Sequence, residues 1–379
     1  VLLHVKYALL NTTISSFIEI KKHDNFDELV ENSFQVRNRI YKLAVFSGII
    51  CLLLGLFAQT LIVDSLGGII NTAKMGDKLR AYGVNNNMYI PASRLFAITL
   101  MPVVLASPYF FLYALRIKKA YNVKVLLTLS LSISILFFLI DAGRIAVIVF
   151  LLTFFLDFAF RKSKHPYVYM VAVSIGVLVL LGLLDDLFFY LSYGFIKESS
   201  NSGIVPIVNE FAFPYLNLVN IIKINGLYGL RWGVDFITWV VNIIPSKILD
   251  VFGLSKVQTG YHFITEYYLG TNASGGIPTD FITLGMRQFG VLGLPLVAFM
   301  ISRIIKFMDS VILNIHNKNL YFMTLRIASI TFLIVPYGDI DSFIRNRFDM
   351  IIVFMFLVVV RRIKLKASKS LEKSRINNE

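Results

Sequence analysis

Cysteine and charged residues are scarce in this chain. Its 379 residues include one cysteine, Cys51, and only 16% charged residues. A single cysteine excludes a disulfide framework, a cysteine-based metal centre and a dithiol redox motif. Nucleotide-phosphate loops, dinucleotide fingerprints, internal repeats and low-complexity tracts are also missing from the sequence. These absences exclude an ATPase or a kinase, and we expect no cofactor.

Apolar residues, by contrast, are abundant. The chain is 56% hydrophobic and 14% aromatic, with a mean hydropathy of +0.71, which predicts an all-α, multi-pass membrane helix bundle rather than a soluble domain. Eight apolar stretches have about the length that a membrane-spanning helix needs. They cover residues 43–63, 90–115, 125–140, 145–160, 167–191, 281–305, 320–335 and 348–360.

The chain begins with an apolar stretch, residues 1–18, which has no initiating methionine and no features of a signal peptide. We interpret it as the end of a helix whose start is missing, so the N-terminus is expected to be truncated. An alternative start codon remains the other interpretation.

The connections between the predicted helices are alternately rich and poor in Lys and Arg along the chain. The rich connections are 21–42, 116–124, 161–164 and 303–318, and the tail 361–379 holds seven basic residues in nineteen. The poor ones are 64–89, 141–144, 190–280 and 338–347. Because cytoplasmic loops collect positive charge, the tail is predicted to be cytoplasmic and the long 190–280 loop extracytoplasmic, within a single membrane domain.

The same pattern explains the net charge of +14, from 37 basic and 23 acidic side chains. The positive residues are spread over loops and a tail that would lie beside anionic headgroups, rather than along one basic face. Membrane lipids are therefore the expected partner of this charge, and nucleic acid is not.

Arginines at or near membrane depth are the first candidate site residues, because an ionisable group is costly there. They are expected on the outer side, where arginine's planar fork could hold a diphosphate. Each also has a structural interpretation. Arg144 could pair locally with Asp141, Arg287 could reach the headgroups beside glycine-mediated helix packing, and Arg345 with Arg347 could belong to a self-neutralising surface loop. The residues are Arg144, Arg287, Arg345, Arg347 and, with a weaker case, Arg94.

Two parts of the long loop read as amphipathic helices. Residues 204–223 are too polar to span a membrane, and residues 232–244 form an apolar run that is too short to do so. Both are expected to lie on the outer leaflet or on the bundle. Trp232 and Trp239, with the Tyr and Phe around them, would provide either stacking surfaces for sugars or interfacial anchors.

Glu210 and His262 are the candidate general bases of the loop. Glu210 lies in an uncharged, largely apolar run, where the pKa of a carboxyl group tends to rise. His262 is spaced to share a helical face with Glu266, but the pair lacks the pattern and third ligand of a zinc site, so no metal is expected. A solvated glutamate and a structural histidine are the alternatives.

Several of these features together resemble a known family. A late, long outer loop on a polytopic chain is similar to the O-antigen or oligosaccharide repeat-unit polymerases of the Wzy type. The resemblance covers most of the chain, and the motifs that carry it are degenerate: Gly67-Gly68 with Arg80 and Tyr82, Gly143-Arg144, Gly260-Tyr261-His262, and Phe289-Gly290 with Gly293.

The resemblance implies a GT-C-like glycosyltransferase of the bacterial inner membrane, making an O-antigen or capsule polysaccharide. It would move a growing glycan from undecaprenyl diphosphate to a new lipid-linked repeat unit. Arg144, Arg287, Arg345 and Arg347 would hold the diphosphate, with His262 or Glu210 as the base. A chain-length regulator is left open as a partner. An O-antigen ligase and a lipid-linked oligosaccharide flippase or other transporter are the alternative functions.

Overall fold

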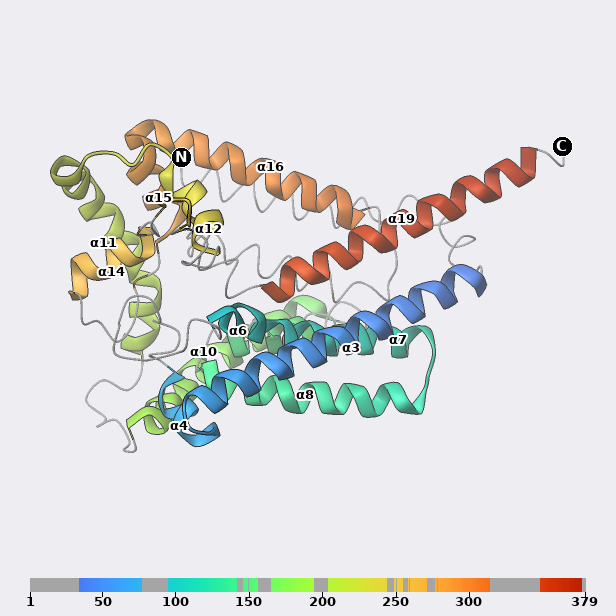
Figure 1. Ribbon diagram of the computed structural model, residues 1–379. Helices are drawn as coiled ribbons and strands as arrows, with labels where there is room; N and C mark the ends of the chain where they lie inside the picture. Colours follow the sequence, from blue (N-terminus) through green and yellow to red (C-terminus); the bar gives the residue numbers. More distant parts are fainter. Residues whose placement is uncertain are drawn as a thin grey trace.

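A computed structural model describes residues 34–76, 95–141, 146–148, 150–155, 165–193, 204–243, 249, 251–254, 258, 260–270, 277, 279–313 and 348–376. Within these ranges all regular secondary structure is helical and no strand occurs, which confirms the all-α prediction. The helices are α3 (Phe34–Ser65), α4 (Ile69–Lys74), α6 (Leu95–Leu100), η2 (Met101–Ala106), α7 (Ser107–Ile117), α8 (Tyr121–Asp141), α10 (Pro166–Tyr193), α11 (Ile204–Tyr228), α12 (Val234–Ile243), α14 (Gly260–Leu269), α15 (Phe281–Phe289), η4 (Gly290–Leu292), α16 (Gly293–Leu313) and α19 (Phe348–Ile376) (Figure 1).

Four stretches of the described chain are long and apolar enough to cross a membrane: Gln35–Ser65, Phe96–Ile117, Tyr121–Asp141 and Phe281–Arg303. They match the predicted spans 43–63, 90–115, 125–140 and 281–305. The predicted span 145–160 overlaps a shorter apolar helix, Ala146–Phe155. The span at 167–191 forms the 28-residue α10, and that at 348–360 begins α19. Residues 1–18 and 320–335 lie outside the described residues.

The main core lies where α3, η2, α7, α8 and α19 pack together. The segment predicted as one span at 90–115 is a helix in three pieces, with the 3₁₀-helix η2 between α6 and α7. Pro102 and Pro108 stand at the starts of η2 and α7, where a residue without an amide proton is tolerated. All six residues of η2 are buried. The break therefore lies inside protein, where neighbouring helices cover the irregular backbone.

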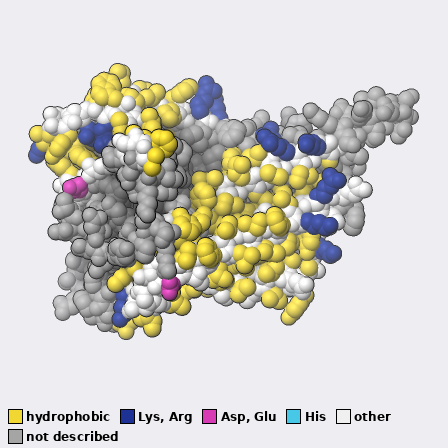
Figure 2. All heavy atoms as spheres, in the orientation of Figure 1, with side chains coloured by type: hydrophobic (Ala, Val, Ile, Leu, Met, Phe, Trp, Pro, Cys, Tyr) yellow, Lys and Arg dark blue, Asp and Glu magenta, His cyan; other side chains and the backbone are white. Residues whose placement is uncertain are grey.

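Basic residues gather at one end of this bundle. The Arg37 guanidinium donates to the carbonyl of Ile117 at 2.6 Å, and the Lys118 ammonium lies 5.9 Å from the centre of the Tyr41 ring. These contacts bring the start of α3 and the α7–α8 turn together, so two connections that were predicted to share one side of a membrane lie at the same end. Figure 2 shows Lys and Arg at this end of a broad apolar surface.

At the opposite end, α4 contacts α10, and α10 in turn contacts α11 (Figure 1). The loop-region helices α11 and α14 pack with α15 through a small core made by Ile221, Ile224, Ile264 and Met286. The two helices predicted within the loop are confirmed as α11, which runs on to Tyr228, and α12. The segments 64–89 and 190–280, both predicted to be outer loops, thus have their described parts at one end of the molecule.

The fourth candidate span is not one straight helix. Helix α15 ends at Gly290, which has φ +61°, and α16 begins after the short η4 and packs against α15. A Cβ atom on Gly293 would collide with the carbonyl of Gly285, and one on Gly285 would lie 2.7 Å from the oxygen of Gly293. Two glycines thus permit a sharp reversal that hydropathy alone does not reveal, while α16 by itself keeps 21 residues, about 30 Å.

Candidate functional site

The predicted site residues are described to different extents. Arg94, Arg144, Arg345 and Arg347 lie outside the described residues, and so do the side chains of Glu210 and His262. The backbones of these last two belong to α11 and α14, so His262 and Glu266 do share one helix. Arg287 is described in full, and the candidate site is therefore built around it.

Arg287 lies near the end of α15 and is 4% exposed. Its Nη1 donates to Asn225 Oδ1 at 3.0 Å and also to the carbonyl of Gly229, and its guanidinium lies 5.0 Å from the centre of the Phe263 ring. Contact with an aromatic face and with polar groups of α11 lets a positive charge remain buried. Glycine-mediated packing does occur in α15, but Arg287 turns into the protein rather than toward a headgroup region.

The loop after α11 binds to the end of α15. The amides of Arg231 and Trp232 donate to the carbonyls of Arg287 and Gln288 at 3.1 and 2.9 Å. These carbonyls belong to the last turn of α15 and would otherwise lack partners. Trp232 adopts a φ of +50°, which a residue with a side chain rarely does. The strained turn sets the Arg231 side chain beside that of Arg287.

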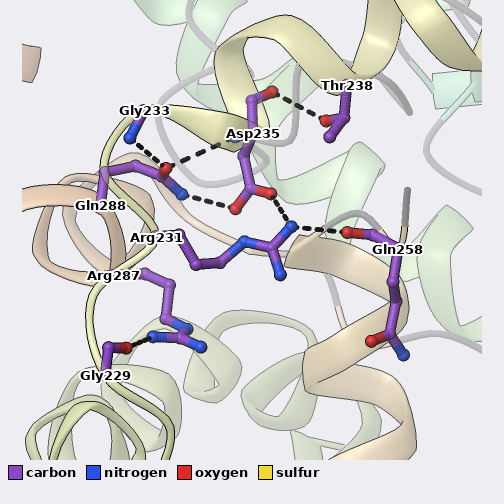
Figure 3. A network of polar contacts seen from close by, with 8 residues as sticks. All are labelled: Gly229, Arg231, Gly233, Asp235, Thr238, Gln258, Arg287 and Gln288. Carbon is purple, nitrogen blue, oxygen red and sulfur yellow. Dashed lines mark hydrogen bonds and ion pairs between the residues drawn. The ribbon is translucent and has the colours of Figure 1, made fainter. Parts of the chain in front are cut away.

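Arg231 forms an ion pair with Asp235, four residues later, at 2.7 Å. The exposed fractions of the two side chains are 17% and 5%. The same Nη2 of Arg231 donates to the carbonyl of Gln258 at 2.7 Å, and Gln258 Nε2 donates to Glu266 Oε2 at 2.6 Å. Figure 3 shows the resulting arginine network, which consists of Arg231, Asp235, Arg287 and Gln288.

Gln288 fixes the other side of Asp235. Its Nε2 donates to Asp235 Oδ2 at 2.5 Å, while its Oε1 accepts from the amides of Gly233 and Asp235 at 2.9 and 3.4 Å. One amide side chain of α15 therefore caps the first turn of α12 and holds the Asp235 carboxylate at the same time. The start of α12 is a favourable place for that negative charge.

Burial raises the pKa of the Asp235 carboxyl above its ordinary value, and this effect outweighs the opposing influence of Arg231, Gln288 and Arg287. The start of α14 contributes to this burial. A Cβ atom on Gly260 would lie 3.0 Å from Asp235 Oδ2, so only a glycine leaves the carboxylate its present room. The Gly260-Tyr261-His262 segment thus begins against Asp235.

The sequence alone did not identify three residues of the arginine network: Arg231, Asp235 and Gln288. Arg231 and Asp235 have the spacing of an ordinary exposed helical ion pair, and Gln288 has no charge to mark it. The available signal is the pair of glycines, Gly229 and Gly233, that brackets Arg231 and Trp232, because flanking glycines of positive φ indicate a tight turn.

Comparison with protein-family models, with curated protein sequences and with solved structures finds no match to this chain. The fold and the four apolar stretches indicate a membrane protein of helical class, and any narrower assignment depends on the sequence motifs and on the chemistry of the arginine network.

Proposed function

We propose that the chain is a GT-C-like glycosyltransferase of the bacterial inner membrane, an oligosaccharide repeat-unit polymerase of the Wzy type. Its substrates are two lipid-linked glycans that carry undecaprenyl diphosphate. The growing glycan leaves its carrier and is joined to the terminal sugar of a new lipid-linked repeat unit. The product is a surface polysaccharide, and a chain-length regulator is the natural protein partner of such an enzyme.

The observation that carries the proposal is the burial of Arg287 at 4% exposure. A fully ionised guanidinium is costly to bury, and a cation in such a setting is a functional candidate by default. It lies on α15, where α11 and α14 of the predicted outer loop pack on that helix, at the end opposite the basic residues of the α3 start and the α7–α8 turn (Figure 1). A diphosphate attached to a membrane-embedded isoprenoid would arrive at this level of the protein.

The reaction needs a cation and a base. The acceptor hydroxyl oxygen attacks the anomeric carbon of the donor, and the bond from that carbon to the phosphate oxygen breaks with its electron pair leaving on the diphosphate. Arg287, with Arg144, Arg345 and Arg347, stabilises the charge on the departing diphosphate. Glu210 or His262 accepts the hydroxyl proton. No nucleotide sugar takes part, in keeping with a sequence that carries no nucleotide-binding motif.

The loop helices fit the role of a lid over this site. Helices α11, α12 and α14 all contribute to the surroundings of Arg287, through Asn225, Asp235 and Phe263. Aromatic side chains are frequent among them, and sugar rings stack on such surfaces. In this proposal the lid brings the base and the acceptor sugar over an arginine-lined pocket at the outer membrane interface.

The test is complementation in a bacterial strain that lacks its own polymerase, with glycan length read by gel electrophoresis. Arg287→Ala is expected to abolish long chains while glycan of a single repeat persists, because the departing diphosphate loses its stabilising charge. A loss on the order of a hundredfold or more in polymer is expected for one such interaction. Arg303→Ala is the matched control, since Arg303 is an exposed arginine that stacks on Phe299.

Three outcomes would contradict the proposal. Normal chain lengths in both Arg287→Ala and Arg144→Ala would show that the assigned arginines do not hold the diphosphate. Accumulation of lipid-linked repeat units on the cytoplasmic face would favour a flippase. In a second strain that lacks its ligase but keeps its polymerase, transfer of full-length polymer to lipid A core by this chain would favour a ligase. Immunoblots of membranes establish that each variant is present in equal amount.

A further inference from the structure

The charges of the arginine network do not balance. Two guanidinium groups face one carboxylate, and the guanidinium of arginine is a cationic group with five donors and no acceptor. In the part of the chain that the structure describes, Glu266 touches the network only through Gln258, and it is exposed. Within the described residues, one positive charge is therefore left in a place where Arg287 is 4% exposed. Because a buried charge without a counter-ion is costly, an anion bound here would stabilise the site.

Hydrogen-bond donors are also left over. Among the contacts of the described residues, Arg287 donates only through Nη1 and Arg231 only through Nη2. The Nε atoms of both arginines are buried and have no partner among the described residues. In Arg287 this leaves Nε and Nη2, the edge of the guanidinium that binds phosphate oxygens through two parallel hydrogen bonds. Figure 3 shows the two side chains extending in the same direction from neighbouring stretches of backbone.

Apart from Arg231, Asp235 is held through its Oδ2 atom. Gln288 donates to its Oδ2, Gly260 packs against the same oxygen, and the carboxylate lies in the first turn of α12. A negative charge in that position is stabilised by the helix itself. Arg231 can therefore turn away while Oδ2 stays bound to Gln288, but the buried Oδ1, which has no hydrogen-bond partner among the described residues, then loses its ion pair and must be left to the field of the α12 N-terminus.

We propose that Asp235 is a displaceable counter-ion, and that Arg231 exchanges it for a phosphate or diphosphate that binds jointly to Arg231 and Arg287. In the ligand-free protein Asp235 competes for Arg231 and keeps the site in order. On binding, the phosphoryl oxygens take the free edge of Arg287 and the Arg231 guanidinium, while Asp235 stays on Gln288. The anion site stands on its own geometry; its assignment to an isoprenoid diphosphate rests on the proposed function.

The test measures binding of inorganic pyrophosphate to the full chain in phosphatidylcholine nanodiscs by isothermal titration calorimetry. Arg231→Gln is expected to weaken binding on the order of tenfold to a hundredfold, as for loss of a charged hydrogen bond. Asp235→Asn is expected to tighten binding several-fold, because the competing charge is removed while the amide still meets Gln288. Asp186→Asn, a change of an exposed aspartate in α10 outside the arginine network, is the control and should bind like the wild type.

If Asp235 has a purely structural role, Asp235→Asn is expected to weaken pyrophosphate binding instead of tightening it. If Asp235→Asn weakened pyrophosphate binding as much as Arg231→Gln, Asp235 would be a scaffold and the exchange would be wrong. Absence of pyrophosphate binding to the wild type would remove the anion site altogether. Where Arg231→Gln is not monodisperse on size exclusion, Arg231→Lys, which keeps the charge but loses the planar fork, replaces it and is also expected to weaken binding.

The source of the phosphate is separated by competition. Displacement of pyrophosphate by farnesyl diphosphate, and not by phosphatidylglycerol in the nanodisc, is the result expected for an isoprenoid diphosphate site. Displacement by phosphatidylglycerol alone would overturn the diphosphate assignment and make this a site for lipid headgroups. Neither result decides whether the cell polymerises glycan, so the chain-length assay can fail or succeed independently.

Discussion

At the scale of single residues, Asp235 concentrates the electrostatics of the network. Its carboxylate is removed from water, and Arg231 and Gln288 return only part of the lost hydration. The pKa of Asp235 is therefore higher in the folded protein than the ordinary value of 3.8. The folded state then binds a proton more readily than the unfolded chain. The free energy of unfolding therefore falls as the pH rises from the ordinary pKa of Asp235 to its raised pKa in the folded protein.

Asp235→Asn should remove this pH dependence. Relative to the variant, wild-type protein is expected to lose stability as the pH rises from 3.8 to the raised pKa of Asp235. The loss approaches about 1.4 kcal/mol for each pH unit of that interval, the free energy of one tenfold change in proton concentration. The measurement is thermal unfolding in detergent from pH 4 upward. Asp280, whose pKa burial also raises, is unchanged in both proteins and cancels in the difference. Parallel curves for the two proteins would show that burial does not perturb Asp235.

The sequence could identify a site residue where its side chain differs in charge from the residues around it. Arg287 stands alone in an apolar stretch, and the cost of placing a charge there was sufficient to select it. Arg231 and Asp235 lie in a segment where an ion pair is unremarkable. Their burial comes from the backbone of residues 231 and 232 pairing with the end of α15, which is a tertiary contact 56 residues along the chain from Arg231.

At the scale of helices, the turn between α15 and α16 determines where Arg287 lies. Asp280 caps α15 by accepting from the amide and the hydroxyl of Thr283 at 2.9 and 2.6 Å. At the other end, Gly285 and Gly293 allow the two backbones to touch. A short, capped helix is thus folded back on α16 and presents Arg287 and Gln288 to α12.

Gly293→Ala is expected to prevent that contact, because its methyl group has no room beside the carbonyl of Gly285. A loss of about 1–3 kcal/mol or more is expected, as for overpacking in a core. Gly176→Ala is the matched control: Gly176 lies within α10 with no atom near its would-be Cβ, and alanine should be neutral or slightly favourable there. Thermal unfolding of both variants in detergent measures this. Equal melting temperatures would show that the two helices can separate without cost.

The helices could be predicted where an apolar stretch is long or where apolar residues recur at helical spacing. The interruptions of these helices were harder to predict. The helices α3, α8, α10, α11 and α12 follow from hydropathy and spacing. Pro102 and Pro108 indicate the break at η2. The local sequence does not distinguish this break, after which the chain continues in the same direction, from the one at Gly290, where the chain reverses. That difference depends on which backbone each segment meets.

At the scale of the whole molecule, the charged residues define two ends of an apolar body. The start of α3 and the α7–α8 turn bring basic side chains to one end, and α4 lies with the loop-region helices at the other. A membrane perpendicular to α3 and α8 would separate these ends. This arrangement agrees with the alternation of basic connections along the sequence.

The only cysteine provides the test of that orientation. Cys51 is buried, and Cys51→Ser gives a background without thiols. A single cysteine is then placed at either of two exposed lysines, Lys74 in α4 or Lys119 in the α7–α8 turn. A membrane-impermeant maleimide should label Lys74→Cys in intact spheroplasts and Lys119→Cys only after permeabilisation. Labelling of both from outside would mean that the Phe96–Ile117 segment does not cross.

Trp232 gives the arginine network an optical reporter. It is 73% exposed, follows Arg231 directly and holds a strained backbone angle. The sequence contains one other tryptophan, Trp239, so that Trp239→Phe leaves a single fluorophore one peptide bond from the network. Release of Arg231 from Asp235 changes the charge next to this indole, which also packs edge-on against Phe289. A shift in the emission wavelength of this one indole on addition of pyrophosphate is the signal expected for that release, with no added label.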